Sequence, residues 1–324
     1  MDDILNKYKL AMLGTGKIAN FHYAAFKSCG FDITHCASKL DSKRAKVFCE
    51  EKSIKNYYSN PFDMLDDYNN WDMVLLAIDT YYNCEYLDKI IESDKLCLVE
   101  KPVSTDLNFL KKYSNLHLEK VRVAYNRRFY KTVEKAKTFI RDNSPVLCKM
   151  ELPEAINLEH ENKYDRVLIN SVHGIDMLRY LFGDIKLKNN TNHLSPDGRI
   201  SILEGDNNSK ICLIMNWNSP SNFSLNIEGN NKRLELKPFE GCKIYEGMKI
   251  IEPTKDWPVR RYIPKELDSS SSFHDTILDM KPGFFEQAME MKNILEGEKP
   301  LKSANLYDAY KTQKITQDIL FRDK

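Results

Sequence analysis

The sequence predicts an α/β protein: a doubly wound parallel sheet in the first part of the chain, then an α+β domain with a mainly antiparallel sheet. Three observations lead to this prediction. Short apolar runs alternate with helical patterns up to residue 125, which is typical of right-handed βαβ units. From residue 184 onward, strand-like runs follow one another across turns rich in Asn and Gly, which indicates antiparallel pairing. The 324 residues suffice for two domains, which we place at residues 1–124 and 125–324.

The composition is that of a globular protein and argues against several classes of partner. Hydrophobic residues make up 42% of the chain and charged residues 29%, and the formal charge of +1 gives no overall field for nucleic acid or a membrane surface. The longest apolar run, residues 73–78, is too short to cross a bilayer, and no apolar signal segment opens the sequence. The eight cysteines include no Cys-x-x-Cys pair, and several lie in apolar runs, as reduced core thiols do. We therefore expect a cytoplasmic protein without a metal site.

The first strand, residues 8–13, leads into a glycine turn. Gly14 to Ala19 reads G-x-G-x-x-A, and a helical pattern follows through residue 26. The first glycine permits the tight turn, Gly16 lets the backbone approach a diphosphate, and the small Ala19 lets the helix pack on the strand. Free N–H groups at the start of the helix then bind phosphate. A structural turn is the alternative, and the position between a strand and a helix favours dinucleotide binding.

The second strand, residues 31–37, bears on the choice of cofactor. An acidic residue at its tip would bind the ribose hydroxyls of NAD. Here the tip reads Ala37-Ser38-Lys39, and the first carboxylate is Asp41. A hydroxyl and a cation suit a 2′-phosphate better, so we favour NADP over NAD. The alternative is that Lys39 is only solvated.

The remaining elements of the first domain continue the alternation. We expect helices at 41–52, 62–68, 81–93 and 105–113, and strands at 54–58, 73–78, 95–99 and 121–125. The strand at 95–99 ends in Glu100-Lys101-Pro102. Pro102 cannot continue a ladder, so Lys101 stands at the rim where open α/β sheets bind ligands. We interpret Lys101 as the centre of the active site. A surface lysine after a strand is the alternative.

The second domain is expected to begin with a strand at 146–152 and a long helix at 164–182. Asn170 and His173 are three residues apart on that helix, so they share a face away from most of its apolar stripe, and Asp176 follows one turn later. A lone histidine is more often a satisfied core residue than a catalytic one. Further strands are predicted at 200–204, 210–217, 223–228, 232–237 and 241–251, as an antiparallel meander with one covered and one open face.

The end of the chain alternates between irregular and helical stretches. Residues 267–282 are the least regular part, with His274 as a candidate contact near the substrate, although a surface linker explains the same pattern. Residues 283–296 and 303–321 are expected to be helices. We expect the last helix to pack back towards the first domain.

Together these motifs resemble the Gfo/Idh/MocA family of NAD(P)-dependent sugar and cyclitol oxidoreductases. The matching segments are the glycine turn, Glu100-Lys101-Pro102, Tyr125-Asn126-Arg127-Arg128-Phe129, and His173-Gly174-Ile175-Asp176 with Leu178 to Gly183. The resemblance implies an N-terminal Rossmann domain and a C-terminal domain with a large open sheet, whose open face often pairs subunits in the family. It also implies that Lys101 and His173 flank the reacting carbon, and it makes Lys101–Pro102 a candidate cis peptide.

Two departures from the family pattern bear on activity. The family usually has Thr-Pro and then His after the apolar strand, whereas this chain has Ile78-Asp79-Thr80 and Asn83. It also commonly has an aspartate four residues before the helix histidine, where this chain has Ile169. The missing carboxylate is compatible with a histidine that works alone, with a different substrate, or with lost activity.

The resulting hypothesis is hydride transfer between NADP(H), or NAD(H), and a hydroxyl-bearing carbon of a sugar, cyclitol or nucleotide sugar. His173 would exchange the hydroxyl proton and Lys101 would polarise the carbonyl oxygen. The predicted substrate contacts are Tyr125, Asn126, Arg128, Asn170 and Asp176. The predicted cofactor contacts are Gly14, Thr15, Gly16, Lys17, Ile18, Ser38, Lys39, Ala77, Ile78, Asp79, Glu100 and Lys101.

Other readings of the same residues stay open. One is a catalytically silent dinucleotide- or sugar-binding regulator, and another is an enzyme for a different substrate, such as a linear tetrapyrrole or diol reductase. For the oxidoreductase we expect a small-molecule, sugar-like substrate and a homo-oligomer, dimer or tetramer, without nucleic acid or membrane partners.

Overall fold

The structure, a computed structural model, describes residues 8–114, 116, 119–154, 167–191, 198–271 and 280–321. Its contacts divide the chain into two compact units. Unit 1 comprises Met1–Phe129 and Thr276–Lys314, and unit 2 comprises Tyr130–Asp275 and Ile315–Lys324. The predicted domain limits, 1–124 and 125–324, stay a prediction, because a compact set of contacts need not coincide with a domain.

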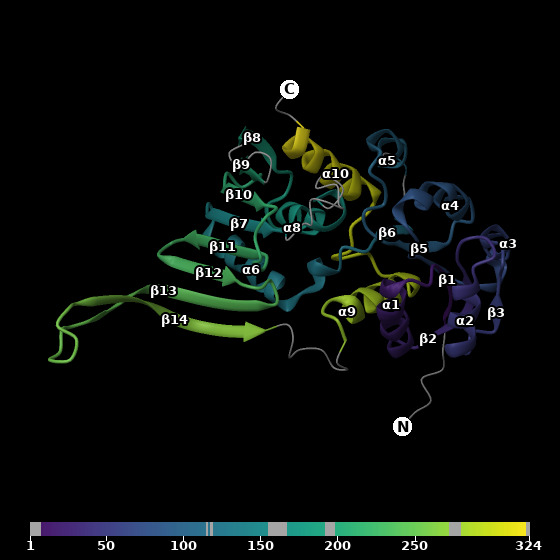
Figure 1. The fold of residues 1–324 in the computed structure, drawn as a ribbon, viewed down its shortest axis with the longest axis horizontal. Coiled ribbons are helices and arrows are strands. Elements are labelled where there is room, and N and C mark those ends of the chain that lie inside the picture. The colour runs from purple at the N-terminus through teal and green to yellow at the C-terminus, as the bar shows by residue number, and fades with distance from the viewer. Residues whose placement is uncertain are drawn as a thin grey trace. The chain divides into compact units, whose positions relative to one another are not determined.

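Unit 1 is built on a six-stranded parallel sheet with the order β3-β2-β1-β4-β5-β6 (Figure 1). Its strands are β1 (Tyr8–Leu13), β2 (Phe31–Ala37), β3 (Asn56–Tyr57), β4 (Met73–Leu76), β5 (Leu96–Val99) and β6 (Val121–Val123). The order reverses between β1 and β4, and the carboxyl ends at such a reversal are where open α/β sheets bind ligands. The predicted doubly wound parallel sheet is confirmed.

Helices cover both faces of this sheet. The helices of unit 1 are α1 (Lys17–Ser28), α2 (Lys43–Glu51), α3 (Pro61–Asp66), α4 (Thr80–Glu92), α5 (Leu107–Ser114) and α9 (Phe284–Leu295), with two short 3-10 turns, η1 (Tyr68–Asn70) and η2 (Asn126–Phe129). Alternate strand residues point to opposite faces. One set, which includes Leu10 and Met12, packs with α1, α2 and α9, and the other, which includes Ala11 and Leu13, packs with α3, α4 and α5. The continuous apolar run in each strand is explained by this burial on both faces.

Unit 2 holds an eight-stranded sheet with the order β14-β13-β12-β11-β7-β10-β9-β8. Its strands are β7 (Leu147–Pro153), β8 (Lys186–Thr191), β9 (Gly198–Glu204), β10 (Lys210–Asn216), β11 (Ser224–Gly229), β12 (Lys232–Leu236), β13 (Gly241–Ile251) and β14 (Arg261–Ser271). The predicted mainly antiparallel sheet is confirmed, but the predicted simple meander is wrong. The first strand, β7, lies between β10 and β11 and pairs with β10 in parallel.

Two strands of this sheet were not predicted. β8 is rich in Lys and Asn and has no apolar run that would mark it as a strand. β14 extends to Ser271 through the serine-rich stretch that we expected to be irregular, because its hydrogen-bonded partner β13 fixes the backbone whatever the side chains. The rest of that stretch, residues 272–279 with His274, lies outside the described residues.

One face of the sheet in unit 2 is covered and the other is open. Helices α6 (Lys131–Asn143) and α8 (Val172–Phe182) pack on the inner face, together with Ile315 and Ile319 from the end of α10 (Leu306–Phe321). Residues on the other face, such as Lys149 and Ile202, are exposed. This alternation confirms the predicted covered and open faces of the sheet.

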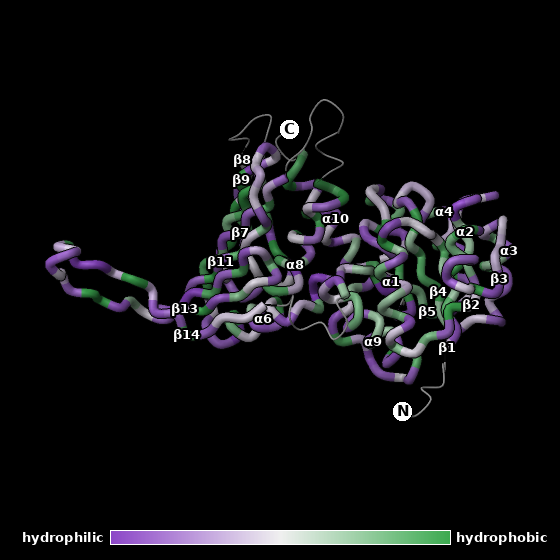
Figure 2. The backbone as a smooth tube through the Cα atoms, turned by 60° about the horizontal axis from the view of Figure 1, so that its bottom comes forward, coloured by the Kyte–Doolittle hydropathy of each residue, from purple (hydrophilic) through white to green (hydrophobic). Residues whose placement is uncertain are grey.

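Strands β13 and β14 continue beyond the rest of their sheet as a two-stranded ribbon. Pairing of β13 with β12 ends at Glu246, and beyond Gly247 only β14 pairs with β13. Both views show the ribbon, residues 247–265, extending past the neighbouring strands β11 and β12 of unit 2 (Figures 1 and 2). Among the described residues, no helix is long and apolar enough to cross a membrane.

Candidate functional site

The glycine turn after β1 is tightly packed at its first residue. Gly14 has φ +118°, and a Cβ atom there would lie 2.1 Å from the carbonyl oxygen of Ala77, at the end of β4. Its N–H donates to the carbonyl of Ala37, at the end of β2, over 2.8 Å. Only glycine satisfies both the backbone conformation and the close approach, so Gly14 holds the carboxyl ends of three strands together.

The next residues fit the diphosphate of a dinucleotide. A Cβ atom on Gly16 would meet nothing within 4 Å, so the backbone borders open space. Gly16 is the N-cap of α1 and supplies no side-chain cap, which leaves the first N–H groups of the helix for a ligand. Thr15 is 4% exposed, and its Oγ1 has no hydrogen-bond partner within the described part of the chain. Lys17 and Ile18, also predicted contacts, form the first turn of α1.

The tip of β2 carries no carboxylate, as the sequence indicated. Ser38 is buried, and the Nζ atom of Lys39 lies 4.2 Å from the ring centroid of Tyr82 on α4. This cation–π contact holds the lysine over the carboxyl edge of the sheet. Asp41 has φ 52°, and its N–H donates to Ser59.

The end of β4 and the start of α4 position the loop after Lys101. Ala77 is buried and Ile78 half-buried, whereas Asp79 caps α4 by accepting from the N–H of Tyr81. Thr80 and Asn83 both donate to the carbonyl of Pro102, and Asn83 also donates to that of Val103 over 3.1 Å. The asparagine at the position of the usual family histidine thus fixes the main chain that follows Lys101.

Glu100 and Lys101 lie at the carboxyl end of β5. The N–H of Lys101 donates to Glu100 Oε2 over 3.1 Å, and the peptide bond to Pro102 is cis, as expected. Glu100 Oε1 lies 2.7 Å from Nε2 of His22, a residue of α1 that is 1% exposed. His22 was missed from the sequence, where the only signal is a polar residue on the buried side of α1. The pair connects the helix of the glycine turn to the residue before Lys101.

A half-buried thiol also borders this loop. Cys84 Sγ lies 3.6 Å from Ser104 Oγ. Burial raises the pKa of the Cys84 thiol, so the group is a neutral thiol at physiological pH and not a nucleophile.

The predicted substrate contacts Tyr125, Asn126 and Arg128 are all buried in unit 1. Asn126 Nδ2 donates to the carbonyl of Pro282 over 3.0 Å. Arg128 Nη1 pairs with Asp308 Oδ2 over 3.3 Å and lies near the carbonyl of Lys302. These donors attach the segment after β6 to residues 280–308. Contact with a substrate stays a prediction for all three.

In unit 2, His173 on α8 is 8% exposed and Asp176 is 1% exposed. A π-helical turn, η3 (Val167–Ser171), precedes α8, so the predicted continuous helix is wrong over these residues, and its predicted start at residue 164 lies outside the described range. In this turn Ile169 is 42% exposed while Ser171 is fully buried. π-helical turns occur frequently at functional sites.

A carboxylate that the sequence did not reveal lies beside this turn. Glu154 follows β7 and is 8% exposed. Its Oε1 accepts from Asn170 Nδ2 over 2.7 Å and from Ser171 Oγ over 2.8 Å. Ile169 leaves the usual family position without an acid, yet Glu154 brings one to the segment just before His173. The sequence did not indicate Glu154, because its partners Asn170 and Ser171 are 16 and 17 residues further along the chain.

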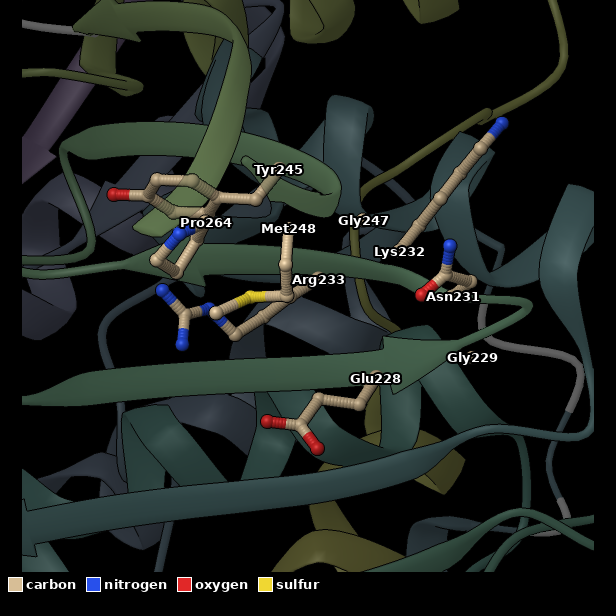
Figure 3. Close-up of a pocket in the computed structure, with 9 residues that line it drawn as sticks. All are labelled: Glu228, Gly229, Asn231, Lys232, Arg233, Tyr245, Gly247, Met248 and Pro264. Carbon is tan, nitrogen blue, oxygen red and sulfur yellow. The ribbon is translucent and has the colours of Figure 1, made fainter. Parts of the chain in front are cut away.

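Unit 2 also has two surface hollows, and none of the predicted site residues lines either of them. One, of about 350 Å³, lies at the base of the ribbon, where the guanidinium of Arg233 stands 4.5 Å from the ring centroid of Tyr245 (Figure 3). The other, of about 640 Å³, lies between α6 and strands β12–β14. Among the described residues, no group of three or more His, Cys, Asp or Glu side chains is placed to hold a metal ion.

Comparison with known proteins gives a family and a fold. Residues 8–126 match the Gfo/Idh/MocA family, described as an oxidoreductase family with an NAD-binding Rossmann fold. No curated protein sequence matches. A Clostridium difficile dehydrogenase is similar in structure, with 19% identity, 97% of this chain and 99% of that chain covered, and a TM-score of 0.75.

Two similar structures contain ligands. A levoglucosan dehydrogenase in complex with NADH and levoglucosan is 16% identical over 97% of this chain and 95% of its own, with a TM-score of 0.75. The myo-inositol dehydrogenase of Lactobacillus casei, in complex with NAD(H) and myo-inositol, is 15% identical over 96% and 93%, with a TM-score of 0.70. At these identities the similarity establishes the fold.

Proposed function

This chain belongs to the Gfo/Idh/MocA oxidoreductase family, through residues 8–126 with their NAD-binding Rossmann fold, and we propose that it transfers hydride between NAD(P) and a secondary alcohol or ketone of a sugar, cyclitol or nucleotide sugar. The observation that carries the proposal is the glycine turn. Gly16 borders open space, and the Thr15 hydroxyl is buried without a partner among the described residues, as a diphosphate site requires.

The bound nicotinamide supplies or accepts the hydride. In the chain itself, His173 exchanges the hydroxyl proton, since an imidazole with an unperturbed pKa of roughly 6.5 does so near neutrality. Lys101 stabilises the partial negative charge on the same oxygen. His22 and Glu100 keep the Lys101 main chain in place, and Asn83 holds the residues that follow it.

The cofactor preference that we propose is NADP over NAD. The support is the tip of β2, where Lys39 is held against Tyr82 and no carboxylate stands at Ser38 or Lys39. A cation there attracts a 2′-phosphate, whereas a carboxylate would have bound the free ribose hydroxyls.

The direct test is a screen for NADP⁺ and NAD⁺ reduction with polyols, cyclitols and nucleotide sugars, and for NADPH oxidation with the corresponding ketones. We expect Lys101→Met and His173→Ala each to lower kcat at least about 100-fold, because acid–base help is typically worth about 10² to 10⁴. Dinucleotide affinity, measured by fluorescence titration, should hardly change. A variant that keeps near-full turnover would show that its residue has no such role.

A second candidate is a catalytically silent dinucleotide- or sugar-binding regulator. Ile169, 42% exposed where the family commonly has an aspartate, favours it, and so do Asp79 and Asn83. Tight NADPH binding without turnover of any compound in the screen would establish this alternative. An enzyme for another substrate class would instead turn over a compound outside the polyols.

We also propose that the protein acts in the cytoplasm as a homo-oligomer. The support for association is the ribbon of unit 2, whose large apolar side chains are exposed: Met248, Ile250, Trp257, Val259, Tyr262 and Ile263. A two-stranded ribbon alone is at best marginally stable in water. A group of exposed apolar side chains on such a ribbon is typical of a surface that another subunit covers.

A further inference from the structure

His22 is buried on the second turn of α1, the helix that begins at the glycine turn. The residue is 1% exposed, and its ring centroid lies 4.8 Å from that of Phe284 on α9 and 6.3 Å from that of Phe26. A polar group in such apolar surroundings is costly unless it is hydrogen-bonded. The hydrogen-bond partner of His22 is Glu100, which follows β5 in the same unit.

Both oxygens of the Glu100 carboxylate contact donors of the protein. Oε1 lies 2.7 Å from Nε2 of His22, and Oε2 accepts the N–H of Lys101 over 3.1 Å. A carboxylate without a proton only accepts hydrogen bonds, so we place the imidazole hydrogen on Nε2. The N–H of Glu100 donates to the carbonyl of Leu76, at the end of β4, over 2.8 Å. Glu100 is thus fixed at its main chain and at both carboxylate oxygens.

The main chain after Lys101 is held by a different helix. Asn83 on α4 donates to the carbonyls of Pro102 and Val103 over 3.4 and 3.1 Å. Lys101 therefore lies between two anchored points, and α1 supplies the one before it. Since side-chain rotamers are defined relative to the backbone, a movement of Glu100 would displace the Lys101 amine.

The helix that carries His22 also begins at the proposed diphosphate site. Gly16, the N-cap of α1, supplies no side-chain cap, so the first N–H groups of the helix gain partners when a diphosphate binds. A bound dinucleotide therefore stabilises the helix on which His22 lies. The same helix thus has contacts at its start for the cofactor and, one turn later, for Glu100.

We propose that His22 is a positioning residue that couples the dinucleotide-binding helix to Lys101: its Nε2–H group holds Glu100, and Glu100 holds the lysine for hydride transfer. The inference rests on the proposed function and adds a chemical requirement, a hydrogen-bond donor at the position of Nε2. Glutamine meets the requirement, because its amide nitrogen is as many bonds from Cβ as Nε2 of histidine is. Asparagine is one bond too short, and phenylalanine has a ring without a donor.

The first test measures amide hydrogen exchange at Lys101 by NMR, in the full-length protein with and without NADPH. We expect His22→Phe to speed this exchange about tenfold, as loss of a hydrogen bond to a charged group does, and His22→Gln to keep the wild-type rate. NADPH should slow the exchange in the wild type and in His22→Gln, but much less in His22→Phe. Phe26→Leu is the matched control: it removes apolar contacts of the same helix and should lower Tm without changing the exchange at Lys101.

The second test measures turnover of the best substrate from the screen. His22→Phe and His22→Asn should each lower kcat about 10- to 100-fold with little change in KM, because a displaced lysine weakens a contact made in the transition state. His22→Gln should stay within about threefold of the wild type, which a role in packing alone would not predict. In the Lys101→Met background, His22→Phe should lower kcat no further, because its effect passes through the amine.

Several results would overturn the coupling while leaving the oxidoreductase intact. They are wild-type exchange and kcat in folded His22→Phe, equal slowing by NADPH with and without the histidine, and a full further loss of kcat in the Lys101→Met background. Equal losses in His22→Gln and His22→Phe would also overturn it, because the donor would then be irrelevant. His22→Asn replaces His22→Phe in both tests if circular dichroism shows that the latter is unfolded. If the wild type turns over no compound, the proposed function fails, and the exchange experiment alone decides whether His22 positions Lys101.

Discussion

Gly14 and Gly16 are two residues apart in one turn, yet each is glycine for a different physical reason. Gly14 is needed by the fold, because its φ is +118° and a Cβ atom would overlap Ala77. Gly16 has an ordinary φ of −75° and open space around it, so its lack of a side chain serves a ligand. A sequence motif does not distinguish these two roles, whereas the backbone geometry does.

The two glycines therefore predict opposite results for the same substitution. Gly14→Ala should lower Tm by several degrees, since overpacking costs roughly 1–3 kcal/mol before the left-handed strain is added. Gly16→Ala should leave Tm unchanged but raise the Kd for the dinucleotide at least about tenfold, because the methyl group occupies the space of the diphosphate. Calorimetry and NADPH fluorescence titration measure the two effects. Unchanged affinity in Gly16→Ala would contradict the diphosphate site.

Lys39 makes the cofactor preference testable. If Lys39 binds the 2′-phosphate as proposed, Lys39→Ala should raise the Kd for NADPH about tenfold, equivalent to about 1.4 kcal/mol, because a charge-assisted contact is lost. The Kd for NADH should change little, since NADH lacks that group, and this makes NADH the internal control. The NADPH effect should shrink as salt concentration rises. Equal losses for both dinucleotides would mean that Lys39 only shapes the loop.

Among single residues, the candidates that the sequence names are those with a local sequence signal. The glycine turn and Glu100-Lys101-Pro102 are short motifs, and each directly follows a predicted strand. Glu154 and His22 escaped notice because their partners are 16 and 78 residues away, and only packing brings them together. Whether the residues named from the sequence contact cofactor and substrate remains a prediction.

At the level of elements, α8 packs closely on β7 at Gly174. A Cβ atom on Gly174 would lie 2.4 Å from Cδ2 of Leu152, so a larger residue there would push against the buried Leu152 side chain two residues before Glu154, which bonds Asn170 and Ser171. The sequence located the helix but not its π-helical first turn. The apolar spacing in the sequence continues through that turn. The wider π-helical turn is recognised only by its backbone hydrogen bonds, which span one residue more than those of an α-helix.

Gly174→Ala tests this packing with a clear sign. In an open helix the change would stabilise by about 1 kcal/mol. Here the new methyl group meets buried Leu152, so we expect a loss of about 1–3 kcal/mol in the free energy of unfolding, measured by urea denaturation. Leu152→Ala alone should lower the free energy of unfolding by about 2–5 kcal/mol. The double variant should lose clearly less than the sum of the two single losses, because the new methyl group then has room. A stabilised Gly174→Ala would disprove the close contact.

At the scale of the whole molecule, strand number and order were the hardest features to predict. The parallel sheet of unit 1 follows from alternating strands and helices, and right-handed crossovers leave few arrangements. In unit 2 the meander was wrong because β7, first in sequence, is inserted between β10 and β11. Nothing in the sequence of these strands indicates that an earlier strand lies between two later ones. β14 was missed in part because serines do not signal a strand that its partner imposes.

The ribbon of unit 2 gives the prediction at this scale. Met248 pairs with Pro264 and Ile250 with Tyr262, so these side chains share one apolar face of the ribbon, on which Met248, Ile250 and Tyr262 are exposed. A surface of this kind is covered in a stable assembly. We expect replacement of residues 248–264 by an Asn-Gly turn, which suits a two-residue hairpin, to leave Tm within a few degrees of wild type and to lower the mass in light scattering to that of a monomer.

A second pair of variants distinguishes the apolar face from the length of the ribbon. Met248→Lys combined with Ile250→Lys places two charges on that face and should dissociate the assembly, because burying unpaired charge is costly. Lys249→Glu changes the charge on the opposite face and should leave the mass unchanged, since a rim charge contributes little to stability. If the shortened ribbon and the double lysine variant both keep the wild-type mass, subunits associate elsewhere, and the exposed apolar residues of the ribbon have another partner.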